Sequence, residues 1–172
     1  QSFRQPGSSI KPLVYAAAME SKKITPSTVF EDKKITFKGD YTPQNYDNKY
    51  YGHVIARQAL IKSLNTVAVM ILDRIGYDKV FSYVQKGLLL SDGEFDKRFS
   101  KTLSFALGSY EISPIESVTL HSLLVNGGNF IIPYGIKFVK DYNGNVVWDN
   151  ESDIHSKIAL YREKTGAIID PV

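Results

Sequence analysis

The segment from Pro6 to Met19 places the expected start of a helix beside two chemically active side chains. Pro6-Gly7 punctuates the chain, and the following run is rich in helix formers, which predicts a helix from Ser8 onward. Positions i and i+3 of a helix share a face, so Ser8 and Lys11 are expected within reach of each other. The positive end of the helix dipole disfavours an ammonium group and favours an oxyanion there. A neutral lysine can activate the hydroxyl of a neighbouring serine as a nucleophile. The alternative for the same residues is a capped helix with an exposed lysine.

A second polar element interrupts an apolar helical pattern. Residues 54–62 read as one helix and residues 66–74 as the next, closed by Gly76, with Ser63-Leu64-Asn65 between them. A serine in such a break can relay a proton, and an asparagine can orient a lysine and a substrate amide. The alternative is an ordinary helix N-cap.

The two elements occur within a longer resemblance. The run Arg4-Gln5-Pro6-Gly7-Ser8-Ser9-Ile10-Lys11-Pro12 resembles the active-serine segment of penicillin-binding proteins, most closely the bifunctional class A branch. Further segments resemble the same family in the same order, nearly end to end: Pro43-Gln44-Asn45-Tyr46, Tyr51-Gly52-His53-Val54, Arg57-Gln58-Ala59-Leu60, residues 107–114, and Val125-Asn126-Gly127-Gly128 followed by Pro133. In that family the first serine is acylated, the lysine helps take its proton, the second serine passes the proton to the leaving nitrogen, and the asparagine contacts the substrate. The resemblance implies Ser8, Lys11 and Ser63 as catalytic residues and Asn65 as a substrate-binding residue.

The same resemblance implies a fold, an activity and a location. The expected fold is the α/β fold shared by penicillin-binding proteins and serine β-lactamases, of which residues 1–172 form a single, partial transpeptidase domain, mainly its helical part. The implied activity is a D,D-transpeptidase that crosslinks peptidoglycan stem peptides ending in D-Ala-D-Ala, is acylated by β-lactams and needs no cofactor. The implied location is the extracytoplasmic face of the bacterial inner membrane, in the periplasm, with the membrane reached only through a segment outside this chain.

Two other classes of function remain open. A D,D-carboxypeptidase or a serine β-lactamase shares the first two motifs, but the Arg4–Gly7 run and the Asn126–Gly128 stretch favour the synthase branch. A non-catalytic scaffold or sensor could keep the fold, but the intact Ser8, Lys11, Ser63 and Asn65 argue against it.

The family's third motif, Lys-Thr/Ser-Gly on an edge strand, has a literal match in Lys164-Thr165-Gly166. We interpret this match as coincidental, because the interval from Asn65 is short for the family and the next residue is Ala167 in place of a hydroxyl residue. Most of the family's five-stranded sheet would then lie outside the chain. An isolated chain of this kind is expected not to be a competent transpeptidase, since it lacks the grip on the substrate carboxylate.

Composition excludes several other functions. The net charge of +3 is mild and the charged residues are spread out, so no nucleic-acid partner is expected. The three histidines lack metal-ligand spacing, which predicts no metal site, and the chain has no cysteine. No transmembrane span or signal peptide appears in the sequence.

Local patterns predict the remaining elements. Residues 22–50 read as an extended connection with one short strand at 35–37, and residues 91–101 as a charged loop. A helix is expected over 77–86, stopped by Gly87, and another from Pro114 to Val125 after a capping box at Ser113. Residues 136–148 read as a hairpin around Asn143-Gly144.

Overall fold

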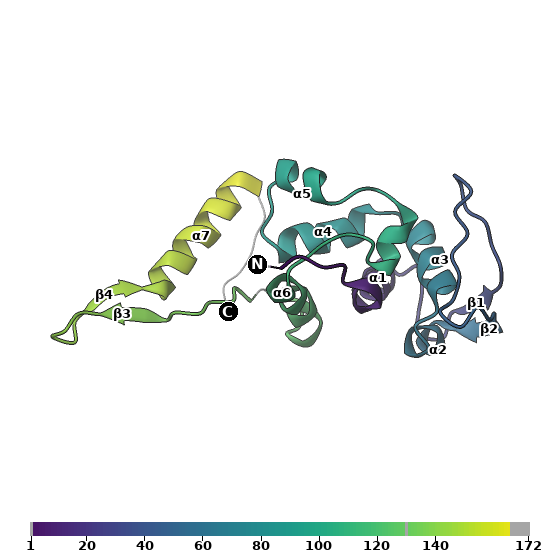
Figure 1. Ribbon diagram of the computed structural model, residues 1–172, viewed down its shortest axis with the longest axis horizontal. Helices are drawn as coiled ribbons and strands as arrows, with labels where there is room; N and C mark the ends of the chain where they lie inside the picture. The colour runs from purple at the N-terminus through teal and green to yellow at the C-terminus, as the bar shows by residue number, and fades with distance from the viewer. Residues whose placement is uncertain (1, 130, 166–172) are drawn as a thin grey trace.

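Helices are the main elements of the fold, and small sheets lie at its two ends (Figure 1). The computed structural model describes residues 2–129 and 131–165. The elements in chain order are η1 (Gly7–Ile10), α1 (Lys11–Glu20), β1 (Val29–Asp32), β2 (Gly52–Ile55), α2 (Ala56–Ile61), α3 (Asn65–Ile75), α4 (Asp78–Gly87), α5 (Asp92–Arg98), η2 (Leu103–Leu107), α6 (Pro114–Val125), β3 (Phe138–Lys140), β4 (Val146–Asp149) and α7 (Asn150–Thr165). The helices expected over 66–74, 77–86 and 114–125 correspond to α3, α4 and α6.

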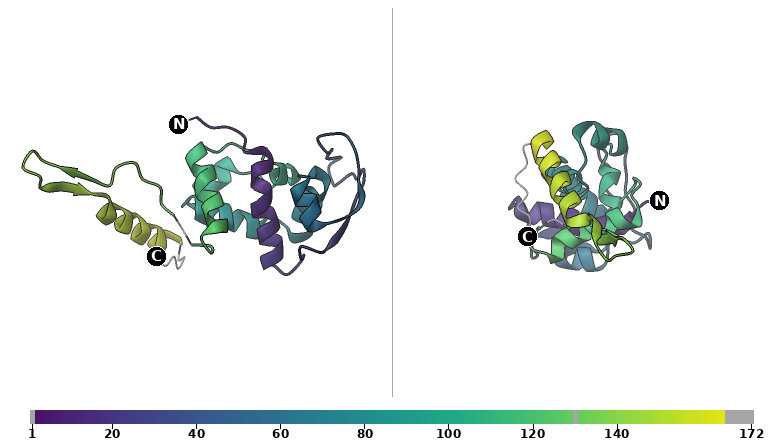
Figure 2. Two further views of the ribbon diagram at one scale, coloured as in Figure 1. Left: turned by 90° about the horizontal axis from the view of Figure 1, so that it is seen from below. Right: turned by 90° about the vertical axis from the view of Figure 1, so that its left-hand side faces the viewer.

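Helix α1 lies at the centre of the core. Its neighbours are α3, α4 and α6, and Figure 2 shows these helices on different sides of it. Leu13, Val14, Ala17 and Ala18 are fully buried, because a helix that is apolar around most of its circumference must be covered on several faces. The core therefore holds the helix that carries Lys11 in a fixed position.

A cluster of aromatic rings joins α4, α5 and η2. Phe81 packs against Phe95 at a centroid distance of 5.0 Å and against Phe105 at 4.7 Å, and Phe105 stacks on Tyr110 at 4.4 Å. Such pairs contribute about 0.5–1.5 kcal/mol each beyond the area they bury. The cluster fixes η2, which packs against η1 and thereby against the segment that carries Ser8.

The prediction of a loop over residues 91–101 was wrong, because α5 occupies most of this segment. Ser91 and Glu94 form a capping box at the start of this helix, and Phe95 buries its ring in the aromatic cluster. The high charge of the segment belongs to the exposed face of α5, and one buried aromatic side chain is enough to hold so short a helix.

Two predictions near the first sheet were also partly wrong. The helix expected over 54–62 begins only at Ala56, because residues 52–55 form β2. This strand pairs antiparallel with β1, with Phe30 opposite Val54. The two β-branched residues of β2 suit a half-buried strand as well as a helix, and the pairing with β1 decides between them. The expected strand at 35–37 is reduced to a single bridge between Phe37 and Tyr41.

The predicted hairpin is confirmed as β3 and β4, which lie with α7 at one end of the molecule (Figures 1 and 2). Gly144 has a φ of 87° in its turn. Among residues 2–129 and 131–165 the strands form two two-stranded sheets, and no five-stranded sheet is present in that part of the chain. The expectation that the chain holds mainly the helical part of its domain agrees with this arrangement.

Gly108 lies so close to Gly7, the residue before Ser8, that no side chain fits there. Its φ is 69°, and a Cβ at this position would lie 2.4 Å from both the backbone N and O atoms of Gly7. We expect Gly108→Ala to lower the free energy of unfolding by about 3 kcal/mol, because a left-handed residue with a Cβ and a backbone clash add together. Thermal unfolding of the complete protein measures this effect.

Gly39 is the matched control, since its φ is 78° but an added Cβ would meet no atom within 4 Å. Gly39→Ala should cost only about 1 kcal/mol, from the backbone conformation alone. Equal losses of stability in the two variants would contradict the close approach of Gly108 to Gly7.

Candidate active site

The Ser8 hydroxyl is exposed in a 3₁₀ turn immediately before α1. The helix expected from Ser8 thus begins as η1 and becomes α-helical only at Lys11. Ser9, its neighbour, donates its hydroxyl proton to the carbonyl of Pro6 at 2.8 Å. Within the part of the chain that the structure describes, the Ser8 hydroxyl makes no hydrogen bond, so it is the free hydroxyl of the pair.

The amine of Lys11 is buried against the turn between α2 and α3. Its side chain is 1% exposed, and Nζ donates to the carbonyl O of Ser63 at 2.6 Å and to Oδ1 of Asn65 at 2.6 Å. The hydroxyl Oγ of Ser63 lies 3.0 Å from the same nitrogen. The predicted contact between the first and second motifs therefore exists, and it runs through the lysine.

Burial lowers the pKa of Lys11 from 10.5 to about 8, because an ammonium ion loses its hydration in this environment. The direction agrees with the sequence-based expectation, but the cause differs. We had expected the helix dipole to disfavour the charge, whereas desolvation accounts for the shift. A minor fraction of this amine is therefore neutral at pH 7, and only the neutral form can act as a general base.

Ser63 and Asn65 lie where the chain changes direction between α2 and α3. Ser63 has a φ of 54°, an uncommon conformation for a residue with a side chain. Asn65 begins α3, and its amide Nδ2 donates to the carbonyl of Gln44 at 2.7 Å while its Oδ1 faces Lys11. The amide is thus held at both ends in one orientation.

Ser8, Ser63 and Asn65 line one cavity of about 390 Å³. Lys11 joins them through its bonds to Ser63 and Asn65, so all four sequence-predicted residues belong to one site. The arrangement contains a free hydroxyl, a buried amine of lowered pKa and a second hydroxyl that contacts this amine. These are the components of acid–base chemistry around a serine nucleophile.

The rim of this cavity holds three residues that the sequence did not single out for a role. The hydroxyl of Tyr51 donates to Oδ2 of Asp47 at 2.5 Å, and Nζ of Lys62 lies 4.8 Å from the centroid of the Tyr51 ring. The hydrogen bond from Tyr51 lowers the pKa of Asp47 and raises that of Tyr51. The rim therefore carries one anion and one cation beside an aromatic ring.

A buried polar network supports the same turn and was also missed. Asp32 is 1% exposed and Asn45 is 3% exposed, and the two side chains bond to each other and to the start of α3. The sequence did hold a weak signal for this network. Phe30 and Asp32 are two positions apart, so in a strand both side chains lie on the same face, and both are buried. A strand in residues 29–32 would have placed a carboxylate inside the protein.

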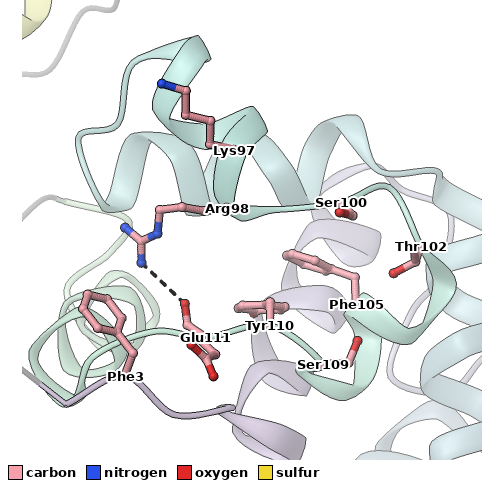
Figure 3. A pocket seen from close by; sticks show the side chains of 9 residues that line it. All are labelled: Phe3, Lys97, Arg98, Ser100, Thr102, Phe105, Ser109, Tyr110 and Glu111. Atoms are coloured by element: carbon pink, nitrogen blue, oxygen red, sulfur yellow. Dashed lines mark hydrogen bonds between the residues drawn. The ribbon is translucent and has the colours of Figure 1, made fainter.

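A second cavity, of about 400 Å³, lies between the N-terminal segment and α5 (Figure 3). Phe3, Arg98, Phe105 and Tyr110 are among the residues that line it, and Arg98 donates to the carbonyl of Glu111 at 3.5 Å. None of the four predicted site residues lines this cavity.

The histidines have no metal-binding arrangement in residues 2–129 and 131–165, where no group of three potential ligands is found. His53 and His155 are exposed, and His121 is a structural contact whose ring nitrogens lie 2.7 Å from the Ser117 carbonyl and 2.8 Å from the Ser9 carbonyl. Across the same described ranges, no helix is both long enough and apolar enough to cross a membrane.

The literal match to the third motif does not lie on a strand. Lys164 and Thr165 end α7, whereas the family places this motif on an edge strand beside the nucleophile. Figures 1 and 2 show α7 next to the β3–β4 hairpin and away from α1 and α3. Gly166 lies outside the described residues. The helical backbone supports our interpretation that the match is coincidental.

Known proteins of similar sequence cover most of this chain. Penicillin-binding protein 1A of Aquifex aeolicus is 35% identical over 154 residues, which cover 87% of this chain and 20% of that protein. Penicillin-binding protein 1A of Neisseria meningitidis serogroup A is 36% identical over 152 residues, or 85% of this chain and 18% of the relative. The chain thus spans about a fifth of the length of these curated relatives.

Solved structures show the same fold. The crystal structure of penicillin-binding protein 1A from Haemophilus influenzae matches with a TM-score of 0.75 and 31% identity, over 87% of this chain and 22% of that one. The PonA1 protein of Mycobacterium tuberculosis matches with a TM-score of 0.74 at 23% identity, over 88% of this chain and 43% of that one. The predicted α/β fold is confirmed. The sequence model of the penicillin-binding protein transpeptidase domain family matches residues 1–161 of this chain. The chain therefore belongs to the penicillin-binding protein transpeptidase domain family.

Proposed function

We propose that this chain carries the acylation centre of a D,D-transpeptidase that crosslinks peptidoglycan stem peptides. The observation that carries the proposal is the buried amine of Lys11, which contacts Ser63 and Asn65 of the second motif, while Ser8 lines the same cavity as these two residues. A buried lysine that contacts a serine and an asparagine lining a cavity is a candidate for a functional role.

The hydrogen bonds around Lys11 suit a base. In the neutral amine the two N–H groups donate to the Ser63 carbonyl and to Oδ1 of Asn65, which can only accept. The lone pair is then left for a hydroxyl proton, from Ser63 or from an approaching Ser8. The two carbonyl groups thus orient the lone pair of the amine toward the reacting side chains.

The reaction follows from these positions. The Ser8 oxygen attacks the carbonyl carbon of the penultimate residue of the stem peptide, and Lys11 takes the Ser8 proton. The proton passes through the Ser63 hydroxyl, 3.0 Å from the amine, to the leaving nitrogen, and the terminal residue departs as the C–N bond breaks. An acceptor amine then attacks the ester, loses a proton to the same groups and restores the Ser8 hydroxyl. Asn65 contacts the substrate amide in this proposal.

β-Lactams are proposed as ligands of the same serine, because their strained amide mimics the stem peptide. The Mycobacterium tuberculosis PonA1 relative has been solved in complex with penicillin V. Peptidoglycan lies outside the cytoplasm, so the proposed location is the extracytoplasmic face of the bacterial inner membrane.

Covalent labelling of the full-length protein tests the proposal. We expect incubation with penicillin to add one intact penicillin mass, and the adduct to persist for many minutes. Rapid release of hydrolysed penicillin would indicate a β-lactamase instead, and hydrolysis of a stem peptide unaffected by added acceptor amine would indicate a carboxypeptidase. A folded protein that never gains mass would indicate a non-catalytic scaffold or sensor.

A further inference from the structure

Asp32 is a carboxylate enclosed by neutral hydrogen-bond donors. It is 1% exposed, and its two oxygens accept from Nδ2 of Asn45 at 3.1 and 3.0 Å, from the backbone N of Tyr51 at 2.9 Å and from the hydroxyl of Thr66. A carboxylate is rarely so buried, because the loss of hydration must be offset by bonds to the charged form. The burial of this carboxylate is costly, and its hydrogen-bond partners hold specific parts of the fold in place.

Asn45 connects this carboxylate to the first turn of α3. Its Nδ2 is bound to Asp32 and to the carbonyl of Lys49 at 2.9 Å, so the amide orientation is fixed. Its Oδ1 then accepts from the backbone N of Asn65 at 2.8 Å and lies 3.4 Å from that of Thr66. Asn45 therefore caps a helix that begins 20 positions later in the chain.

This cap from a distant segment replaces a local one. The N-cap residue of α3 is Leu64, whose side chain has no acceptor, and Ser63 before it has a left-handed backbone conformation. A residue in that conformation is strained by about 1–2 kcal/mol and persists only where its surroundings determine it. The adjacent Gln44 holds the side chain of Asn65, so residues 44–45 fix both the backbone and the amide of Asn65.

We propose that Asp32 and Asn45 are positioning residues of the acylation reaction. Asp32 orients Asn45, Asn45 fixes the start of α3, and this start holds Asn65 and Ser63 at the distances from Lys11 that the proton transfer needs. The inference rests on the proposed function. It assigns no contact with substrate to either residue, since both act through Asn65 and its neighbours.

The test compares four versions of the full-length protein. Asp32→Asn removes one acceptor and adds a donor that faces other donors, and Asn45→Asp places two carboxylates together, so each breaks the pair. The double variant carries both changes and tests whether the two residues act through the same contact, since coupled residues lose less together than the product of their separate losses. Asp40→Asn is the matched control, because it removes an exposed acid from the same connecting segment.

We expect each single variant to lower the first-order rate constant of penicillin acylation about 10- to 100-fold, because displacements near 1 Å at a reacting site have effects of this size. The noncovalent dissociation constant should change less than threefold. The double variant should be within about threefold of the slower single variant, because both changes break the same contact, and Asp40→Asn should match the wild type. Single variants that acylate at the wild-type rate, or a double variant whose loss equals the product of the two single losses, would overturn the inference.

Hydrogen–deuterium exchange gives a second reading that needs no catalysis. The backbone amide of Asn65 donates to Asn45, so this amide should exchange faster in Asn45→Ala, while the amides in the middle of α3 keep their protection. Unchanged protection of Asn65 would overturn the role of Asn45 as a cap. If Asp32→Asn does not fold, Thr66→Val removes one donor to Asp32 at similar volume and undergoes the same rate measurement. A wild-type protein that is never acylated contradicts the proposed function, and the exchange measurement still tests the cap.

Discussion

Replacing Ser8 by alanine is expected to abolish acylation by penicillin, with a fall of about a millionfold in rate, because no other group supplies the attacking oxygen. The fold should be unaffected, since the Ser8 side chain is exposed and makes no hydrogen bond in the described part of the chain. Mass spectrometry of the penicillin-treated protein measures the loss directly. Digestion of the wild type should place the adduct on the peptide that contains Ser8.

Ser9→Ala is the control for this experiment. The two serines are adjacent, but the Ser9 hydroxyl donates to the Pro6 carbonyl, and Ser8 lines the cavity of the site. We expect this variant to be acylated within a fewfold of the wild-type rate. An adduct on Ser9 or Ser63 with Ser8 unmodified would contradict the assignment of the nucleophile.

Replacing Lys11 by arginine should reduce acylation by about 100- to 10,000-fold, the range typical of a lost general base. A guanidinium group keeps the charge but does not lose its proton in a protein, so it cannot accept the proton of Ser8. Stopped-flow acylation of the variant measures the loss. Lys79→Arg is the control, because Lys79 forms an exposed ion pair with Glu20 at the far end of α1. Acylation of Lys11→Arg at the control rate would remove Lys11 from the mechanism.

The pKa of Lys11 also sets the pH dependence of acylation. With a pKa of about 8, roughly a tenth of the amine is neutral at pH 7 and nine tenths at pH 9. The neutral form is the base, so the acylation rate should rise about tenfold between these pH values and then level off. An acylation rate that is constant from pH 7 to pH 9 would contradict the role of this amine as the base.

The motif residues were predictable from sequence, but the groups that support them were not. Ser8, Lys11, Ser63 and Asn65 were found because their spacing resembles a known family and because hydroxyl and amine groups carry the chemistry. Asp32 stands in a polar segment that reads as solvent-exposed, and only its pairing in β1 turns it inward. Its contact with Thr66 spans 34 positions, which no local pattern encodes.

Local structure was predictable where a strong short-range signal existed. The capping box at Ser113 located α6, and Asn143-Gly144 located the hairpin. Residues 52–55 fitted both a strand and a helix, and the pairing with β1 decided the outcome. Helix α5 lies in a segment whose charge is typical of a loop, but it begins with a capping box and Phe95 anchors it in the core.

The distant cap of α3 has a consequence for how the protein acquires its reactivity. The contacts of Lys11 with Ser63 and Asn65 join residues 52 and 54 positions apart, and the cap joins residues 20 positions apart. Contacts of such sequence separation form late during folding, since the chain must first close the intervening loops. Partly folded chains will therefore contain the serine without its base in place. Penicillin labelling during refolding should lag behind the recovery of helical circular dichroism. The rate of labelling would then report when the contacts of Lys11 with Ser63 and Asn65 have formed.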